Sequence, residues 1–343
     1  MKLYLNIYIP LSYLISMACL VTGAPGWVGS RLINRLVDSG RRVKCLTLPQ
    51  ADTRDLSNLG VEVFRGDVTK PETLSTAVEG VDVVFHCAGV IHPSNPKIFH
   101  EVNTWGTRNL LDASVSAGVN CFIYVSSSSA ASGYSSPKVQ TEEDEPEPYR
   151  QYGESKLNAE RYVKEVQESH GFRAVILRPS WLYGPGFAGR QLGFVEMIRS
   201  GRPVLFGDGR NLRSLCHIDN CVDALLQSEA TSGRDCRAYN IADQQPYLLT
   251  DLYDLTAGCW DMELNPLRIP LPSYDGIVYD AADRLMQGLR FRHPTLHLAW
   301  DWAKNIVCSI EKAGRDIGYR PGKSFRAGIR ETVDWLRIEG KIK

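Results

Sequence analysis

The hydrophobic residues of this chain fall into short apolar runs, separated by stretches with helical periodicity. The runs have the length of buried strands and cover residues 17–21, 43–47, 61–64, 81–87, 121–125 and 174–177. Strands that alternate with helices form a parallel sheet with helices on both faces, so the pattern predicts an α/β fold. Beyond residue 180 the alternation is less regular, which indicates a smaller C-terminal domain.

Residues 1–16 form an apolar extension ahead of the first predicted strand. The stretch Leu3–Leu20 carries no charge, as in a signal peptide or a membrane anchor, but it is short and impure for the ~20 apolar residues that cross a bilayer. It is interrupted by Asn6, Pro10, Ser12 and Ser16. Cleavage near Ala18 would remove the first strand. We therefore expect a non-essential extension or an upstream start, with peripheral membrane contact through residues 3–16 as the less favoured alternative.

Composition is that of a globular enzyme. The 343 residues are 43% hydrophobic and 23% charged, enough for a large core and about two domains. Lys and Arg balance Asp and Glu at 39 each, so the chain lacks the basic character of a nucleic-acid-binding protein. Nine cysteines without a CxxC pair favour reduced thiols and a cytoplasmic location. Cys216, His217 and Cys221 fit no zinc spacing, and we predict no metal site.

A glycine-rich turn follows the first predicted strand. Its glycines are three residues apart, in a GxxGxxG pattern rather than GxGxxG, and helical character begins near Arg31. Glycine permits the sharp turn and lets backbone N–H groups approach a pyrophosphate at the helix N-terminus, although such a turn also occurs without a cofactor. The residues predicted to bind a dinucleotide here are Gly23, Gly26, Trp27, Val28 and Gly29.

Tyr152 and Lys156 are four residues apart, a spacing that places a phenol and an ammonium on one face of a helix. A free tyrosine titrates near pH ~10, and a neighbouring cation lowers its pKa by favouring the phenolate. The pair therefore predicts a site of proton transfer, although the same spacing also arises by chance on solvated helices.

These motifs, taken in order, resemble the extended short-chain dehydrogenase/reductases, in particular the NAD-dependent epimerase/dehydratase group that acts on nucleotide sugars. The resemblance covers most of the chain and includes an arginine-proline motif near residue 178 and the tail from Gly318 to Trp335. It implies a Rossmann-type doubly wound sheet in residues 17–180 and a mainly substrate-binding region in 181–343, with part of 214–245 returning to the sheet. The further cofactor-binding residues that it implies are Asp67, Val68, Cys87, Ala88, Gly89, Asn103, Pro179 and Ser180.

The resemblance also implies the catalytic roles. Ser127 would hydrogen-bond the reacting oxygen, Tyr152 would exchange the hydroxyl proton, and Lys156 would hold the cofactor ribose and keep the tyrosine acidic. Ser128 is the alternative serine, also expected to contact substrate, whereas Ser126 and Ser129 are expected to be structural. Only an enzyme needs Ser127, Tyr152 and Lys156 together. Their presence therefore argues against a non-catalytic dinucleotide-binding regulator.

The expected reaction is 4-epimerisation of a nucleotide sugar through a transient ketone. Family dehydratases carry an Asp-Glu pair after the catalytic serine, where this chain has Ser128 and Ser129. Arg213 resembles the arginine that clamps a nucleotide-sugar diphosphate, with an ordinary surface arginine as the alternative. His217 and Asp219 are expected to be structural. The rival reaction is a single hydride transfer, as in an NADP-dependent reductase or a 3-beta-hydroxysteroid-type dehydrogenase, and the segment 271–302 resembles sterol-processing relatives.

The second strand decides between NAD and NADP in this family, and here it ends with Leu48. An acid at this position would bind the ribose 2′-hydroxyl and an arginine would accept a 2′-phosphate. Leucine does neither, so both cofactors stay open, with NAD preferred by analogy; Lys44, Arg31 and Arg54 are cations that could reach a phosphate. The family analogy also implies a homodimer, formed through the helices near 99–117 and 152–168.

Overall fold

The computed structural model describes residues 17–91, 93, 95–132, 136, 138–186, 189–229, 236–270 and 304–342. The extension 1–16 and the segment 271–302 lie outside the described residues. Within the described part, every helix is too short or too polar to span a bilayer.

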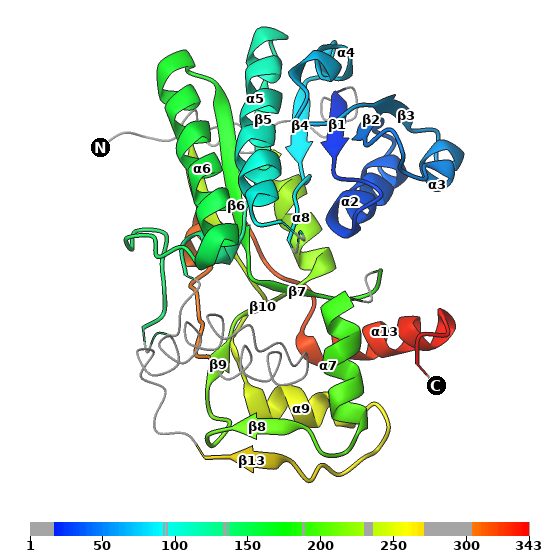
Figure 1. Ribbon diagram of the computed structural model, residues 1–343, viewed down its shortest axis with the longest axis vertical. Coiled ribbons are helices and arrows are strands. Elements are labelled where there is room, and N and C mark those ends of the chain that lie inside the picture. The colour runs from blue at the N-terminus through cyan, green and yellow to red at the C-terminus, as the bar shows by residue number, and fades with distance from the viewer. Residues whose placement is uncertain are drawn as a thin grey trace.

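A seven-stranded parallel sheet forms the upper half of the molecule in Figure 1, with the strand order β11-β6-β5-β4-β1-β2-β3. The strands are β1 Ala18–Thr22, β2 Arg42–Thr47, β3 Glu62–Arg65, β4 Val83–His86, β5 Cys121–Val125, β6 Arg173–Pro179 and β11 Arg237–Ile241. Each apolar run named above overlaps one of the first six strands, which confirms the predicted α/β fold. The order reverses between β1 and β4, and at such a point the carboxyl ends of the strands leave a crevice for a ligand.

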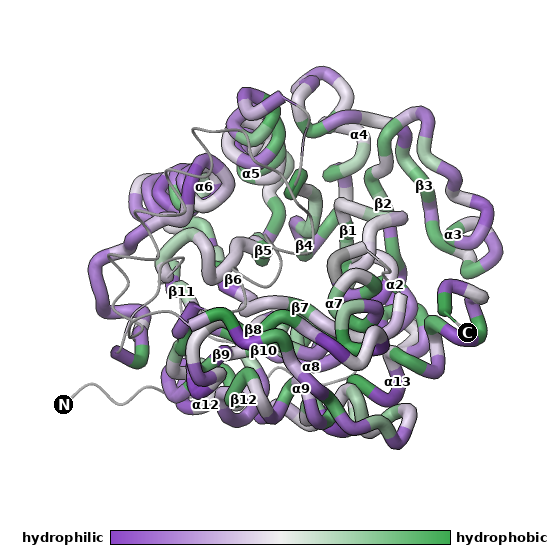
Figure 2. The backbone as a smooth tube through the Cα atoms, turned by 60° about the horizontal axis from the view of Figure 1, so that its bottom comes forward, coloured by the Kyte–Doolittle hydropathy of each residue, from purple (hydrophilic) through white to green (hydrophobic). Residues whose placement is uncertain are grey.

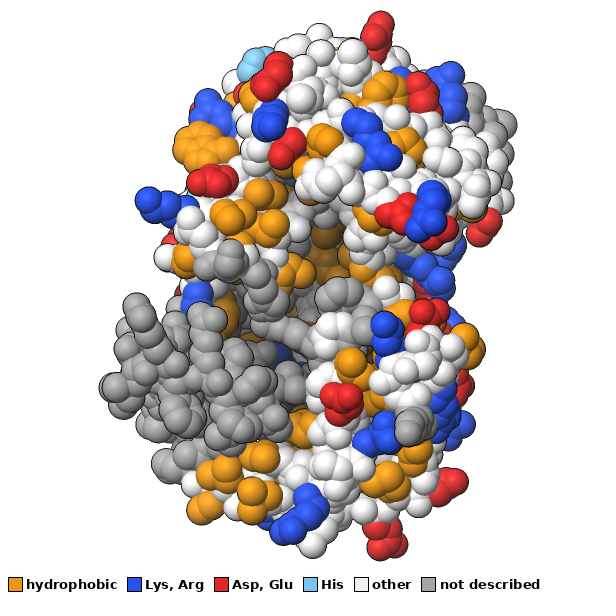
Figure 3. All heavy atoms as spheres, turned by 45° about the vertical axis from the view of Figure 1, so that its right-hand side comes forward, with side chains coloured by type: hydrophobic (Ala, Val, Ile, Leu, Met, Phe, Trp, Pro, Cys, Tyr) orange, Lys and Arg blue, Asp and Glu red, His pale blue; other side chains and the backbone are white. Residues whose placement is uncertain are grey.

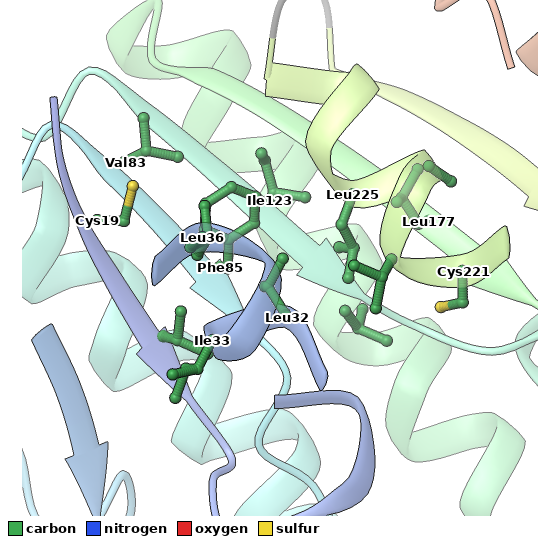
Figure 4. Close-up of a cluster of buried hydrophobic side chains, with 14 of the residues drawn as sticks. Cys19, Leu32, Ile33, Leu36, Val83, Phe85, Ile123, Leu177, Cys221 and Leu225 are labelled. Carbon is green, nitrogen blue, oxygen red and sulfur yellow. The ribbon is translucent and has the colours of Figure 1, made fainter. Parts of the chain in front are cut away.

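Helices cover both faces of the sheet (Figure 2). One face is covered by α2 Trp27–Asp38 and α8 Ile218–Glu229, and the other by α4 Ser75–Val78, α5 Thr107–Ser116 and α6 Arg150–His170. Successive strand residues point to opposite faces, so Cys19 packs in the first layer and Leu20 in the second. Figure 4 shows the first layer, in which Leu32 and Leu36 of α2 lie near Phe85 of β4.

Shorter elements complete the upper half. They are α3 Arg54–Asn58, the 3-10 turns Pro71–Thr73 and Ser128–Ala130, the π-helical segment Phe99–Gly106 that leads into α5, and α12 Glu311–Asp316, which packs near β11. The π-helical turns continue directly into α5, so the region predicted as one helix is continuous but changes its winding at Thr107.

In the described residues, the lower half contains three short strand pairs and three helices around a second core (Figure 1). The pairs are β7 Trp181–Tyr183 with β10 Leu215–His217, β9 Leu212–Arg213 with β12 Tyr247–Leu248, and β8 Val204–Phe206 with β13 Leu267–Ile269. The helices are α7 Gly189–Arg199, α9 Leu249–Ala257 and α13 Phe325–Ile338. Phe194, Tyr253 and Phe325 are buried where these elements meet.

A buried carboxylate, Asp243, joins three strands of the lower half, β7, β10 and β12, to helix α8. One oxygen accepts hydrogen bonds from the Tyr183 and Tyr247 hydroxyls, at 2.6 and 3.1 Å. The other accepts from the His217 backbone N–H at 2.9 Å and the Asn220 side-chain amide at 2.7 Å. All four donors are neutral groups, and burial raises the pKa of the Asp243 carboxyl.

The extended segment 304–309 connects the two halves. Ser214 N–H donates to the Ile306 carbonyl at 2.9 Å, and Gln140 N–H donates to the Val307 carbonyl at 2.8 Å. The segment therefore lies between β9 and the loop that leads into α6.

Candidate active site

The glycine-rich turn between β1 and α2 has an exposed, tightly folded backbone. Gly23 has a φ of 87°, and the Gly26 N–H donates to the Gly23 carbonyl at 2.8 Å. A Cβ on Gly26 would lie 2.4 Å from that carbonyl oxygen, and one on Gly29 would lie 2.9 Å from the nitrogen of Ala24. Side chains are therefore excluded, and the N–H groups that begin α2 suit the pyrophosphate of a dinucleotide.

The next two residues of this motif contact the protein. Trp27 donates its indole N–H to the Pro185 carbonyl at 2.7 Å, and its ring occupies the space where Gly186 would carry a Cβ. Val28 packs against the sheet core. The glycine turn is thus tied to the loop after β7, and the role of both side chains in cofactor binding stays a prediction.

The end of β3 presents Asp67 at the carboxyl edge of the sheet. One of its oxygens accepts from the Thr69 N–H at 2.9 Å and from the Thr69 hydroxyl at 2.8 Å, which fixes the carboxylate in a tight turn. Val68 is buried and fits against Gly106, where a Cβ would lie 2.6 Å from its methyl group. The role of Asp67 in adenine binding stays a prediction, whereas the Val68 side chain packs in the core.

The loop after β2 leaves the cofactor choice open. Leu48 is 45% exposed at the position that selects the ribose substituent, and Arg65 ties the loop down by donating to the Ala51 carbonyl at 2.6 Å. The three cations considered above all bind groups of the protein. Arg31 binds Asp219, Arg54 binds Asp52, and Lys44 donates to the Glu79 carbonyl.

Residues 87–89, at the end of β4, line the site where we expect the nicotinamide ribose. Ala88 N–H donates to the Thr22 hydroxyl at 3.2 Å, and the half-buried Cys87 packs against the core below. Gly89 is exposed, and a Cβ there would lie 3.1 Å from Asn103 Oδ1 and 3.2 Å from Lys156 Nζ. The ammonium of Lys156 therefore lies against bare backbone, which leaves room for a ribose.

Asn103 connects the loop after β4 to helix α6, which carries Tyr152 and Lys156. Its fully buried side chain accepts from the Val90 N–H at 2.8 Å and donates to the Ser155 hydroxyl at 3.0 Å. The asparagine thus joins the loop after β4 to α6, one residue before Lys156.

Lys156 is 4% exposed and donates to the Val125 carbonyl at the end of β5, at 2.9 Å. Burial lowers the pKa of its ammonium to about 8, and the nearby Cys87 and Glu160 oppose that shift. The lysine is therefore charged at neutral pH, but it loses its proton in a mildly alkaline solution.

Tyr152 lies one turn earlier on α6 and is half-buried, with its ring 5.9 Å from that of Phe99. Ser127 is half-buried after β5, and its hydroxyl accepts from the Ser129 N–H at 3.2 Å. Ser128, the alternative serine, is also half-buried and begins the following 3-10 turn. The helix and the strand end are bound to each other through the Lys156 bond, so the predicted triad occupies one edge of the sheet.

The sequence motifs did not identify a buried ion pair that lies beneath this edge. Arg178 of β6 donates to both oxygens of Glu160, at 2.9 Å from Nε and 2.6 Å from Nη2, and Ser126 donates its hydroxyl to Glu160 at 2.6 Å. Ser126 is therefore structural in this arrangement. The Glu160 side chain lies four residues after Lys156, and this spacing was the available signal.

The two residues after Arg178 are buried. Pro179 pairs with Ile241 in the sheet, and the Ser180 hydroxyl lies 3.3 Å from the Cys308 sulfur. In the lower half, Arg213 is 5% exposed on β9, so it is not an ordinary surface arginine. Its part in substrate binding stays a prediction.

His217, Asp219 and Glu331 lie close enough to suggest a cation site, with ligand atoms within 4.8 Å of one another. Each carboxylate already binds a cation of the protein, because Asp219 pairs with Arg31 and Glu331 pairs with Lys323. Burial lowers the pKa of His217 to about 4, so its imidazole is neutral at physiological pH. We interpret the group as an ion-pair cluster that ties α2 and α13 to β10.

Figure 3 shows a hollow between the upper and lower halves, with hydrophobic side chains inside it. The fold and the site define a dinucleotide-binding α/β protein with a tyrosine-lysine pair. The chain belongs to the NAD dependent epimerase/dehydratase family, whose model matches residues 19–242. It is an extended short-chain dehydrogenase/reductase with NAD(P) as its cofactor, as the resemblance implied.

Relatives match over nearly the whole chain. An uncharacterized protein, y4nL, of Sinorhizobium fredii (strain NBRC 101917 / NGR234) is 32% identical and covers 94% of this chain and 96% of its own. The 2-alkyl-3-oxoalkanoate reductase of Stenotrophomonas maltophilia (strain K279a) is 30% identical, covering 92% and 98%. The UDP-glucose 4-epimerase of Vibrio cholerae is 29% identical, covering 92% and 94%.

The fold is shared with solved structures of the same kind. MoeE5, solved in complex with UDP-glucuronic acid and NAD, matches with a TM-score of 0.73 at 24% identity and covers 94% of this chain and 99% of its own.

Proposed function

We propose that the protein transfers hydride reversibly between NAD(P) and a carbinol carbon of a small-molecule substrate. The observation that carries this proposal is a half-buried Tyr152, one helical turn from a buried Lys156 that is bonded to the end of β5. A buried cation near a phenol favours the phenolate and gives the site an acid/base that works near neutral pH.

The residues have separate tasks. The bare turn Gly23–Gly29 would bind the pyrophosphate, and Asp67 would bind the adenine. Lys156 and Asn103 would shape the ribose site beside Gly89. The nicotinamide accepts or supplies hydride when it is bound. Ser127 would hold the substrate oxygen while Tyr152 takes its proton, or returns it in the reverse direction.

The specific reaction that we propose is 4-epimerisation of a nucleotide sugar. It needs one acid/base and an intermediate that rotates within the site, and the two positions directly after Ser127 are Ser128 and Ser129 in place of the Asp-Glu pair of the family dehydratases. The buried Arg213 supports an anionic substrate, because its guanidinium can bond two phosphate oxygens. The epimerase relative supports the same substrate class.

The second candidate is a single hydride transfer to a ketone. It is favoured by the reductase relative, whose identity and coverage are equal to or greater than those of the epimerase relative. The two reactions differ in what happens to the cofactor, which an epimerase regenerates in each cycle and a reductase consumes.

Cofactor content separates the two candidates. The protein is purified, the dinucleotide that it retains is identified by mass spectrometry, and turnover is followed with substrate deuterated at the reacting carbon. Retained NAD and deuterium that stays in the product support epimerisation. An empty site with stoichiometric consumption of NADPH supports the reductase and rejects the epimerase.

Replacing Tyr152 with Phe tests the assignment of the acid/base. We expect kcat to fall by roughly 100-fold or more, since general acid–base catalysis contributes about 10²–10⁴, with the dinucleotide Kd nearly unchanged. Tyr162→Phe is the matched control, because that tyrosine lies on the same helix and bonds Asp112 on its outer side. Residual activity near that of the parent would refute the assignment.

A further inference from the structure

The pair Glu160–Arg178 lies directly beneath the proposed catalytic groups, and the mechanism above does not use it. Glu160 is 0% exposed and Arg178 is 2% exposed. Their guanidinium–carboxylate contact has two short bonds, of 2.9 and 2.6 Å. Such a pair is costly to bury, so its presence beneath the site needs a reason beyond stability.

Two side chains of α6, one turn apart, bind consecutive residues at the end of β5. Lys156 donates to the Val125 carbonyl at 2.9 Å, and Glu160 accepts from the Ser126 hydroxyl at 2.6 Å. The next residue is Ser127. The helix that carries Tyr152 and the strand end that carries Ser127 are therefore held in register by Lys156 and Glu160 together.

We propose that Glu160 and Arg178 form a positioning pair, which fixes Ser127 relative to Tyr152 and whose opposite charges cancel each other beside Lys156. This inference rests on the proposed function, in which Lys156 binds the ribose and supports the phenolate.

The groups that face Lys156 come from three elements. From β4 come His86, whose pKa burial lowers to about 3, and Cys87, whose pKa burial raises, so both are neutral at physiological pH. From β5 comes the Tyr124 ring, 4.9 Å from the ammonium. From α6 come Tyr152 and Glu160. Among the described groups that face Lys156, Glu160 thus supplies the formal negative charge, and Arg178 balances it.

Charge balance predicts opposite effects from the two halves of the pair. In Glu160→Gln the amide can still accept from Ser126, but the negative charge is lost and Arg178 is uncompensated, so the pKa of Lys156 falls. In Arg178→Met the carboxylate is uncompensated, so the pKa of Lys156 rises. A shift of roughly 1 pH unit is expected in each direction, at the lower end of the effect of one charge at 4–6 Å.

The readout is the dinucleotide Kd measured against pH from 6 to 10, which requires no turnover. The parent should lose affinity as pH rises through about 8, where Lys156 gives up its proton. Glu160→Gln should move this midpoint down, Arg178→Met should move it up, and the double variant should return it to within ~0.3 unit of the parent. The matched control, Glu165→Gln, removes an exposed charge from the same helix and should leave the midpoint in place.

A purely structural pair would give a different result. Both single variants would then lower the melting temperature and weaken binding at every pH without moving the midpoint, or would move it in the same direction, and either outcome overturns the proposal. If a single variant fails to fold, the double variant and Ser126→Ala still test the proposal. Ser126→Ala leaves both charges intact, so it should lower kcat several-fold with no midpoint shift, and an unchanged kcat would reject the positioning of Ser127.

Failure of the proposed function gives a distinct pattern. If no substrate is turned over but the midpoints move in opposite directions, the charge balance stands and the assigned reaction is wrong. If Tyr152→Phe is inactive and neither midpoint moves, the reaction stands and the positioning pair is wrong.

Discussion

Two carboxylates are buried in different parts of the molecule, and they are stabilised in opposite ways. Glu160 in the upper half is 0% exposed and is bound by the charged Arg178. Asp243 in the lower half is 3% exposed and is bound by four neutral donors from separate elements. The first arrangement supplies a balanced pair of charges beside the proposed catalytic residues. The second supplies a junction that holds the lower half together.

The difference teaches what each half requires. The upper half is a continuous sheet, whose backbone bonds already fix its shape, so a buried polar pair there is free to serve the site. The lower half consists of two- and three-residue strands, which are too short to be stable alone, and a carboxylate with four acceptor sites joins them.

Asp243→Ala should have the largest effect on stability. The change leaves the hydroxyls of Tyr183 and Tyr247, the His217 N–H and one of the two Asn220 amide N–H groups without an acceptor. An unsatisfied buried donor costs about 1–3 kcal/mol, so we expect the free energy of unfolding to fall by about 4 kcal/mol after partial relaxation. Urea denaturation measures it. A loss below about 1 kcal/mol would show that Asp243 is not a junction.

Tyr247→Phe should cost less, by about 2 kcal/mol. Its hydroxyl donates to Asp243 at 3.1 Å and also accepts from the Phe325 N–H at 2.9 Å, so its loss leaves the start of α13 unsatisfied. Tyr183→Phe is the control, with an expected loss of about 1 kcal/mol, because its hydroxyl donates to Asp243 at 2.6 Å without binding the start of α13. Equal losses in denaturation experiments would contradict a role for Tyr247 in docking α13.

Replacing both Glu160 and Arg178 tests whether this pair, unlike Asp243, contributes little to stability. In Glu160→Gln combined with Arg178→Met neither charge is left uncompensated, and the free energy of unfolding should change by about 1 kcal/mol or less. The corresponding single variants should each lose more than the double variant. A strongly destabilised double variant would mean that the upper pair, like Asp243, is mainly structural.

The smallest expected effect is a change in the pH dependence of stability. The pKa of Asp243 is raised in the folded state by burial, so the folded protein holds this proton more tightly than the unfolded chain. Its contribution is fully present below the unfolded pKa of ~3.9 and is lost as pH rises through the folded pKa. Asp243→Asn removes this term, so the variant should lose less stability than the parent as pH rises above ~4. Parallel curves would contradict the raised pKa.

Local spacing made the upper half predictable. The strands, the glycine turn and the Tyr152–Lys156 pair depend on residues within about one helical turn of each other, and the structure places them on one sheet edge. The winding change at Thr107 was not predictable, because π-helical and α-helical turns share nearly the same apolar pattern.

The buried polar groups were not predictable from spacing. Asp243 meets Tyr183 across 60 residues, and Ser126 meets Glu160 across 34, so their pairing depends on how the strands are ordered in the sheet. The partners of Arg31 and Lys44 were missed for the same reason. A sequence identifies a charged side chain, but the fold decides whether it meets a ligand or a protein group.

The late position of segment 304–309 in the chain limits the order in which parts of the molecule can fold. Its partners near Leu212 and Ser136 are 93 and 169 residues earlier in the chain. All seven strands of the sheet precede this segment in the chain and can pair before it leaves the ribosome. The loop that leads into α6 and strand β9 can bind the segment only after that. Contacts of such long sequence separation form slowly. Nascent chains should therefore acquire a folded sheet well before they acquire a finished catalytic site.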